Sequence, residues 1–153
     1  MDILEHIKDE HDRFKNLIKK IETSDASTKK NLFHELYAKI YGHHEAEEHI
    51  LFPLVKEEVD GEDKEVVLEM IEEHSLGSYQ FSVLEKTSVD NETWDAKFSV
   101  LKEVLEHHMD EEEAEFMPIA REVLSEQQRA EIYEEFETVH EENTEKQAKK
   151  LKQ

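Results

Sequence analysis

Apolar residues recur every three or four positions along most of the chain, which is the spacing of one buried face of an α-helix. Four such stretches follow one another, separated by the short segments TSDAS, VDGED and KTSVDNE. Because short connections join antiparallel neighbours, the pattern predicts an all-α, up-down-up-down four-helix bundle. The predicted inward residues are Ile3, Ile7, His11, Phe14, Ile18 and Ile21; Leu32, Leu36, Ile40, His43, Glu47, Ile50 and Leu54; Val67, Met70, His74, Gly77, Phe81 and Leu84; and Phe98, Leu101, Leu105, His108, Glu112 and Ile119.

Local signals mark where these helices begin and break. Thr28 is a candidate cap for the second helix, and Gly61 supplies the turn before the third. Pro53 and Pro118 lie inside the second and fourth patterns. Each proline is expected to kink its helix or to restart it about one turn earlier, since proline lacks a backbone N–H.

A further helix is predicted after the bundle, because SEQQ at 125–128 has the residues of a capping box. Ile132, Phe136 and Val139 form the apolar side of this additional C-terminal helix, and the polar tail after His140 is expected to fray. The predicted division is a bundle over residues 1–124, with residues 125–153 packed on or extending from the same domain.

Composition restricts the classes of function that remain. The net charge of -21 argues against nucleic acid and anionic membrane surfaces, since both are bound by Lys and Arg. No apolar run approaches a membrane span and no secretion signal is apparent, so a cytoplasmic protein is expected. The absence of cysteine excludes disulfides and thiolate ligands. Any metal site must therefore be built from imidazole and carboxylate groups.

A histidine–carboxylate phrase occurs twice, as HHEAEEHILFP at 43–53 and HHMDEEEAEFMP at 107–118. When the two are aligned on their prolines, His43 lies opposite His108 and Glu47 opposite Glu112. Each histidine and glutamate are four residues apart, on one helix face that is otherwise apolar. His11 and His74 occupy inward positions on the other two helices, so all four helices direct a histidine into one bundle.

The combination favours a metal centre over a set of ordinary core histidines. One buried histidine usually only hydrogen-bonds a neighbour, but two ionised carboxylates in an apolar core are costly unless they are neutralised. No Lys or Arg lies on these faces. Two divalent cations would resolve the conflict, with imidazoles as terminal ligands and carboxylates as bridges. The predicted ligands are His11, His43, Glu47, His74, His108 and Glu112.

Ligand type alone allows Fe, Zn, Cu or Mn. Two ions with two histidines each would remain short of six ligands, which suits a pair of oxo- or hydroxo-bridged iron ions better than closed tetrahedral zinc. Among the other histidines, only His6 and His44 could compete, if a helix rotated by part of a turn. His34, His49, His107 and His140 are expected to lie outside the site.

At these residues the chain resembles the hemerythrin-like HHE cation-binding family over roughly residues 1–122. The resemblance rests on DEHDRF around His11, the two His-x3-Glu-Glu…Pro phrases, and the single inward histidine of IEEHSLGSYQF. It implies a four-helix bundle with a non-haem di-iron site held by the six predicted ligands. Oxygen-carrying hemerythrins have a second histidine four residues after the third-helix ligand, where this chain has Ser78. The missing ligand predicts an open coordination position on that side.

Two functions from different classes follow. The first is a protein that binds or senses O2, NO or iron at the di-iron site. The second is a peroxide-consuming, peroxidase- or catalase-like enzyme. A helical interaction protein with a zinc-filled or vestigial site is a third, structural interpretation. The sequence favours a metal but does not separate binding from turnover, because no catalytic partner residue is identifiable in it.

Overall fold

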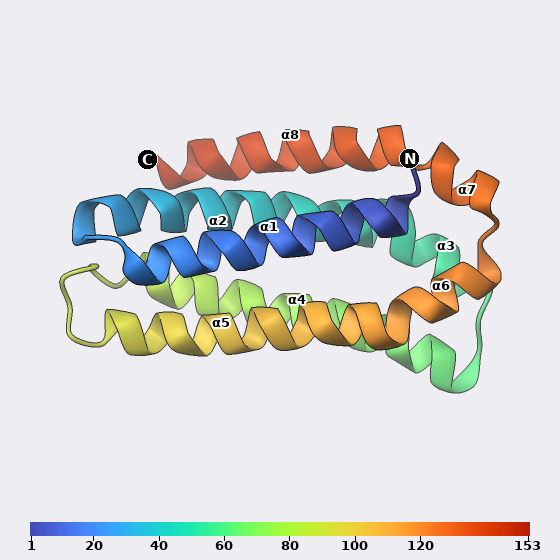
Figure 1. Ribbon diagram of the computed structural model, residues 1–153, viewed down its shortest axis with the longest axis horizontal. Coiled ribbons are helices and arrows are strands. Elements are labelled where there is room, and N and C mark those ends of the chain that lie inside the picture. The colour runs from blue at the N-terminus through green and yellow to red at the C-terminus, as the bar shows by residue number, and fades with distance from the viewer.

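The computed structural model describes residues 1–153 and contains helices without any strand, which confirms the all-α prediction. In Figure 1 the long helices of the predicted bundle lie side by side, each antiparallel to the next along the chain. They are α1 (Ile3–Thr23), α2 (Ala26–Ala46), α4 (Gly61–Glu85) and α5 (Trp94–Glu111). No helix has the length and apolarity needed to cross a membrane.

Each predicted proline break takes the form of a π-helical turn. The turns are η1 (Glu47–Leu51), followed by α3 (Phe52–Glu57), and η2 (Glu112–Phe116), followed by α6 (Met117–Val123). The N–H of Phe52 donates to Glu47 O, and the N–H of Met117 donates to Glu112 O, each across five residues. The wider turn accommodates a proline one residue later, and both π turns begin at a predicted bridging glutamate.

Side-chain caps begin several of the helices. The Asp2 carboxylate accepts a hydrogen bond from Leu4 N at 2.8 Å and begins α1. The prediction of Thr28 as the cap of α2 was wrong, because Asp25 caps this helix and Thr28 N donates to it at 2.9 Å. The predicted capping box at Ser125 is confirmed, and it begins α7 (Glu126–Glu131).

The C-terminal helix α8 (Tyr133–Leu151) lies along the outer side of α2 (Figure 1). The expectation of a frayed tail was wrong, since α8 continues eleven residues beyond His140 to Leu151. Phe136 and Gln147 on α8 are buried. Gly42 allows the close approach, because a Cβ built on it would lie 2.4 Å from the backbone oxygen of His140. A small residue on α2 therefore fixes the position of α8.

The apolar core consists of two clusters at opposite ends of the bundle. One is formed around Ile7, Phe52 and Phe116, and the other around Phe14, Phe81 and Leu105. Between them lies a layer of buried histidine and glutamate side chains. The bundle thus encloses a polar layer between two apolar ones, and this layer is the candidate site.

Candidate metal centre

All six predicted ligands lie in the buried polar layer. Each exposes at most 3% of its surface, and Glu47 and Glu112 expose none. The long helices contribute one histidine each, and the two π turns contribute the glutamates. The structure therefore brings together every residue of the predicted set, which comprises His11, His43, Glu47, His74, His108 and Glu112.

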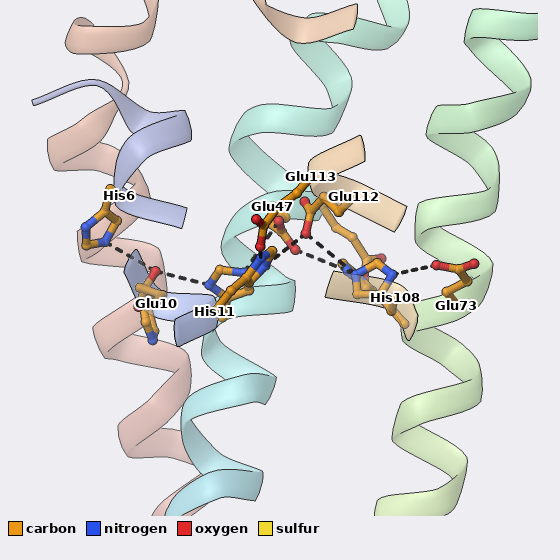
Figure 2. A network of polar contacts seen from close by, with 12 residues as sticks. His6, Glu10, His11, Glu47, Glu73, His108, Glu112 and Glu113 are labelled. Atoms are coloured by element: carbon orange, nitrogen blue, oxygen red, sulfur yellow. Dashed lines mark hydrogen bonds and ion pairs between the residues drawn. The ribbon is translucent and has the colours of Figure 1, made fainter. Parts of the chain in front are cut away.

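The Nε2 atoms of the four histidines lie close to the two glutamates, and Figure 2 shows His11 and His108 on either side of Glu112. Around Glu112 Oε1, His11 Nε2 lies at 3.1 Å and His108 Nε2 at 3.7 Å. Around Glu47, His43 Nε2 lies 3.5 Å from Oε2 and His74 Nε2 lies 3.1 Å from Oε1. Each carboxylate is thus shared by histidines from two different helices.

The opposite ring nitrogen, Nδ1, of each histidine contacts an outer glutamate. His11 Nδ1 lies 2.8 Å from Glu113, and His43 Nδ1 lies 3.1 Å from Glu10. His74 Nδ1 lies 2.8 Å from Glu48, and His108 Nδ1 lies 2.7 Å from Glu73 (Figure 2). Such contacts fix the tautomer that leaves Nε2 free to bind a cation, and they raise the basicity of the ring.

Sequence reasoning missed these four outer glutamates. A signal was present, since each is adjacent in sequence to a predicted ligand: Glu10 to His11, Glu48 to Glu47, Glu73 to His74 and Glu113 to Glu112. Each nevertheless contacts a histidine on another element, so the partner could be identified only from the tertiary structure.

The glutamate oxygens at the centre lack hydrogen-bond partners. Both carboxylate oxygens of Glu47 and both of Glu112 are buried without a hydrogen bond, as is Nε2 of His43. Burial together with the charge of Glu112 raises the pKa of Glu47 well above its ordinary value. Burial lowers the pKa of His11, but contacts with Glu112 and Glu113 outweigh it and raise the value to about 9. Unpaired buried oxygens beside inward-facing imidazoles fit bound cations, which would supply the missing positive charge.

His44 is a further histidine that the structure adds to the layer. Its ring stacks on that of His74 with centroids 3.6 Å apart, and its ligand atom lies within 4.8 Å of those of Glu47, His74 and His108. Burial and the neighbouring histidines lower its pKa well below the ordinary value. It is therefore neutral, which is the form that binds a metal. The sequence places it off the inward face, but α2 packs against α1, α4 and α8, so more than one of its faces is covered.

The remaining histidines lie outside this layer. His49 and His107 have side chains that are 64% and 74% exposed, as expected, and each contacts a glutamate one turn away. His34 contacts Glu85 at 2.7 Å near the surface. His6 and His140 join a separate group between α1 and α8, so His140 is more buried than its sequence position indicated.

Two spaces border the polar layer. A cleft of about 460 Å³ between α2 and α4 reaches His44 and His74, and its wall includes Tyr41, Ser78 and Tyr79. A small internal void of about 10 Å³ touches His11, His43, His44 and His108, and Phe14, Ile40, Leu105 and Met109 form the rest of its wall. Solvent therefore reaches one side of the layer, and a mixed polar and apolar void adjoins it.

Known proteins resemble this chain in both sequence and structure. The family model of the Hemerythrin HHE cation binding domain matches residues 2–120 of the sequence. A crystal structure of a hemerythrin HHE cation binding domain-containing protein from Mycobacterium kansasii superposes with a TM-score of 0.84. It is 24% identical and covers 95% of this chain and 89% of the other, a similarity that concerns the fold alone. No curated protein matches the sequence.

The matched domain spans every one of the six predicted ligands, and the superposed structure extends the likeness to nearly the whole fold. The buried histidine–glutamate layer contains the imidazole and carboxylate groups that could hold a metal ion. The chain therefore belongs to the hemerythrin HHE cation-binding family.

Proposed function

We propose that the protein is a non-haem di-iron protein that binds or senses a small diatomic ligand, O2 or NO. The proposed iron ligands are His11, His43, Glu47, His74, His108 and Glu112, with His44 as an additional one. Iron would supply redox chemistry and coordination positions for the small ligand. The side chains of the protein would hold the two ions and keep the histidines in one tautomer.

The observation that carries this proposal is the overlap of two ligand groups. One consists of His11, His43, Glu47 and Glu112, and the other of His44, Glu47, His74 and His108. Within each group the ligand atoms lie within 4.8 Å of one another, and Glu47 belongs to both. A carboxylate common to two groups favours a bridged pair of ions over a single one.

The void and the cleft beside the polar layer support the proposal that the bound ligand is a small molecule. The void beside His11 and His43 has room for about one water-sized molecule, and half of its lining is apolar. Ser78 occupies the position at which oxygen carriers have a further histidine, and it lies on the wall of the cleft that reaches His74. This side of the proposed iron site therefore faces solvent. A serine hydroxyl is a weak ligand, which leaves that side available.

A matched pair of adjacent histidines provides the test. The buried His108 should be required for iron, whereas His107, whose side chain is 74% exposed, should not. We expect two irons per chain in protein purified without oxygen, a loss of iron in His108→Gln and full iron in His107→Gln. Addition of NO to the iron-loaded protein should change its absorption spectrum. Iron-free wild-type protein after anaerobic loading would refute the proposal.

Peroxide consumption is the second candidate, and the cleft between α2 and α4 favours it. That cleft has a volume of about 460 Å³ and reaches His44 and His74, so it offers a molecule as small as peroxide a route to the site. Steady-state measurement of peroxide loss separates the two functions. Repeated turnover by the iron-loaded protein, absent in His108→Gln, would identify an enzyme. A single stoichiometric reaction would support ligand binding.

We also propose that residues 1–124 form the metal-binding bundle and that residues 125–153 extend the same domain. Phe136 of α8 belongs to the apolar cluster that contains Ile7 and Phe52, which supports one shared core. A chain shortened after Leu124 should then expose apolar surface and unfold at a lower temperature than the full chain.

A further inference from the structure

A second group of histidine and glutamate side chains lies between α1 and α8, outside the candidate di-iron site. We call it the α1–α8 cluster, and it consists of His6, Glu10, Glu137 and His140. Figure 2 shows His6 and Glu10 on α1, beside α8 and to one side of the central layer. His6 and Glu10 are each 6% exposed, so half of the cluster is nearly as buried as the central layer.

The ligand atoms of His6, Glu10 and Glu137 lie within 4.8 Å of one another, and His140 faces the second oxygen of Glu10. His6 Nε2 lies 2.5 Å from Glu137 Oε1 and 3.2 Å from Glu10 Oε1. His140 Nδ1 lies 3.1 Å from Glu10 Oε2 and 3.7 Å from Glu137 Oε1. Four ligand atoms at about 2.0–2.1 Å around a tetrahedral ion are separated by roughly 3.3–3.4 Å from one another. The separation of His6 Nε2 from Glu10 Oε1 is close to that value, and the His6–Glu137 contact is shorter.

An ion-pair network without metal accounts for only part of this arrangement. A proton on His6 would neutralise one of the two carboxylates, and neutralising the other would need a proton on His140. His140 Nδ1 is also buried and makes no hydrogen bond, although Glu10 Oε2 is 3.1 Å away. The contact is close but poorly aligned, so hydrogen bonds do not complete an ion-pair network here.

A cleft gives an ion access to the cluster from solvent. It has a volume of about 590 Å³ and lies between α1, α2 and α8. Glu10, Glu137 and His140 are on its wall. This cleft shares no lining residue with the cleft between α2 and α4 that reaches His44 and His74. An ion could therefore reach the α1–α8 cluster without passing through the central layer.

We propose that the α1–α8 cluster binds one additional divalent transition-metal ion, held by His6, Glu10 and Glu137. One imidazole and two carboxylates, with a fourth position left for water, suit Zn²⁺ among the common divalent ions. Glu10 would join the two sites, because its Oε1 contacts His43 Nδ1 at 3.1 Å while its Oε2 faces His140. The ion would also fasten α8 to α1.

The test uses the full chain with the central site already filled by iron. Iron-loaded protein is equilibrated with Zn²⁺ and freed of excess, and both metals are measured. We expect one zinc per chain with no loss of iron. Glu137→Gln and Glu137→Ala should lose the zinc and keep the iron, since Glu137 contacts His6 and His140 but no proposed iron ligand. Glu142→Gln, at an exposed position on α8, serves as the matched control and should keep both metals.

Zinc-edge X-ray absorption of the wild-type protein gives a second measurement that needs no variant. We expect four nitrogen and oxygen ligands at about 2.0–2.1 Å. The proposal is overturned if the iron-loaded protein retains no zinc, if the α8 variants bind as much zinc as the wild type, or if the zinc has a hydrated six-oxygen shell. Iron content reports separately on the proposed di-iron site, so failure of one site is distinguishable from failure of the other.

Discussion

Replacement of Gly42 by alanine tests how α8 is held against the bundle. A Cβ at this position would lie 2.1 Å from Thr144 Oγ1, 2.4 Å from His140 O and 2.9 Å from His140 Cδ2. Real Cβ atoms essentially never approach other atoms this closely, so α8 must move. The hydroxyl of Thr144 could rotate away, but the carbonyl of His140 belongs to the backbone of α8 and can shift only with the helix.

The magnitude follows from two opposing effects. Forcing an extra methyl group into a packed contact costs about 1–3 kcal/mol. Alanine in place of glycine in a helix interior returns about 0.5–1 kcal/mol. The net loss should be about 1–2 kcal/mol, which lowers the unfolding midpoint of a domain of this size by roughly 2–8 °C.

Gly77→Ala is the matched control. Gly77 also lies inside a long helix, α4, but a Cβ there would meet only Leu105 Cδ2 at 3.4 Å, an ordinary contact distance. This variant gains the helix preference of alanine without a clash, so its stability should be unchanged or higher by up to about 1 kcal/mol. Opposite shifts from the same chemical change would isolate the contact with α8.

Thermal unfolding followed by circular dichroism is the assay, with all variants loaded to the same metal content. Adding Thr144→Ala to Gly42→Ala should recover only part of the loss, because the contact with the His140 carbonyl remains. If Gly42→Ala unfolds at or above the wild-type midpoint, the close approach of α2 and α8 is not what positions α8.

Three further predictions concern metal and charge. Complete chelation should lower the thermal midpoint, because the central carboxylates then lack a counter-charge, and equal midpoints before and after would show that the metal is an accessory. Glu73→Gln should weaken iron retention about 10- to 100-fold by removing the partner of His108 Nδ1, whereas the exposed neighbour Glu72→Gln should not, as measured by competition with a chelator. Burial raises the pKa of Asp2, but the hydrogen bonds that its carboxylate accepts from Arg129 and Leu4 N outweigh burial and lower this pKa overall. The carboxylate therefore stabilises the fold above the unfolded pKa of about 3.9, and this stabilisation is lost as the pH falls through the lower folded pKa. Asp2→Asn should therefore cost about 1 kcal/mol at pH 7 and almost nothing in acid, and urea unfolding that shows the same loss at both pH values would contradict the ion pair.

The sequence by itself determined the bundle and the inward position of the six proposed ligands. Helical periodicity is a local property of the sequence. Burying an ionised carboxylate such as Glu47 on an apolar face costs so much free energy that its presence predicts a positive counter-charge nearby. The doubled phrase with its prolines also marked both interruptions, since a missing N–H must be accommodated within about one turn of the chain.

Tertiary structure alone decided which neighbours these residues have. The rotation of each helix about its axis is set by packing, so the sequence could not show that His44 lies over His74 or that Glu73 reaches His108 on another helix. The polar end of the chain became an ordered helix for the same reason. Its few apolar side chains predict little alone, but Phe136 fills the shared core and Gly42 lets α8 lie against α2, contacts that exist only after the bundle has formed.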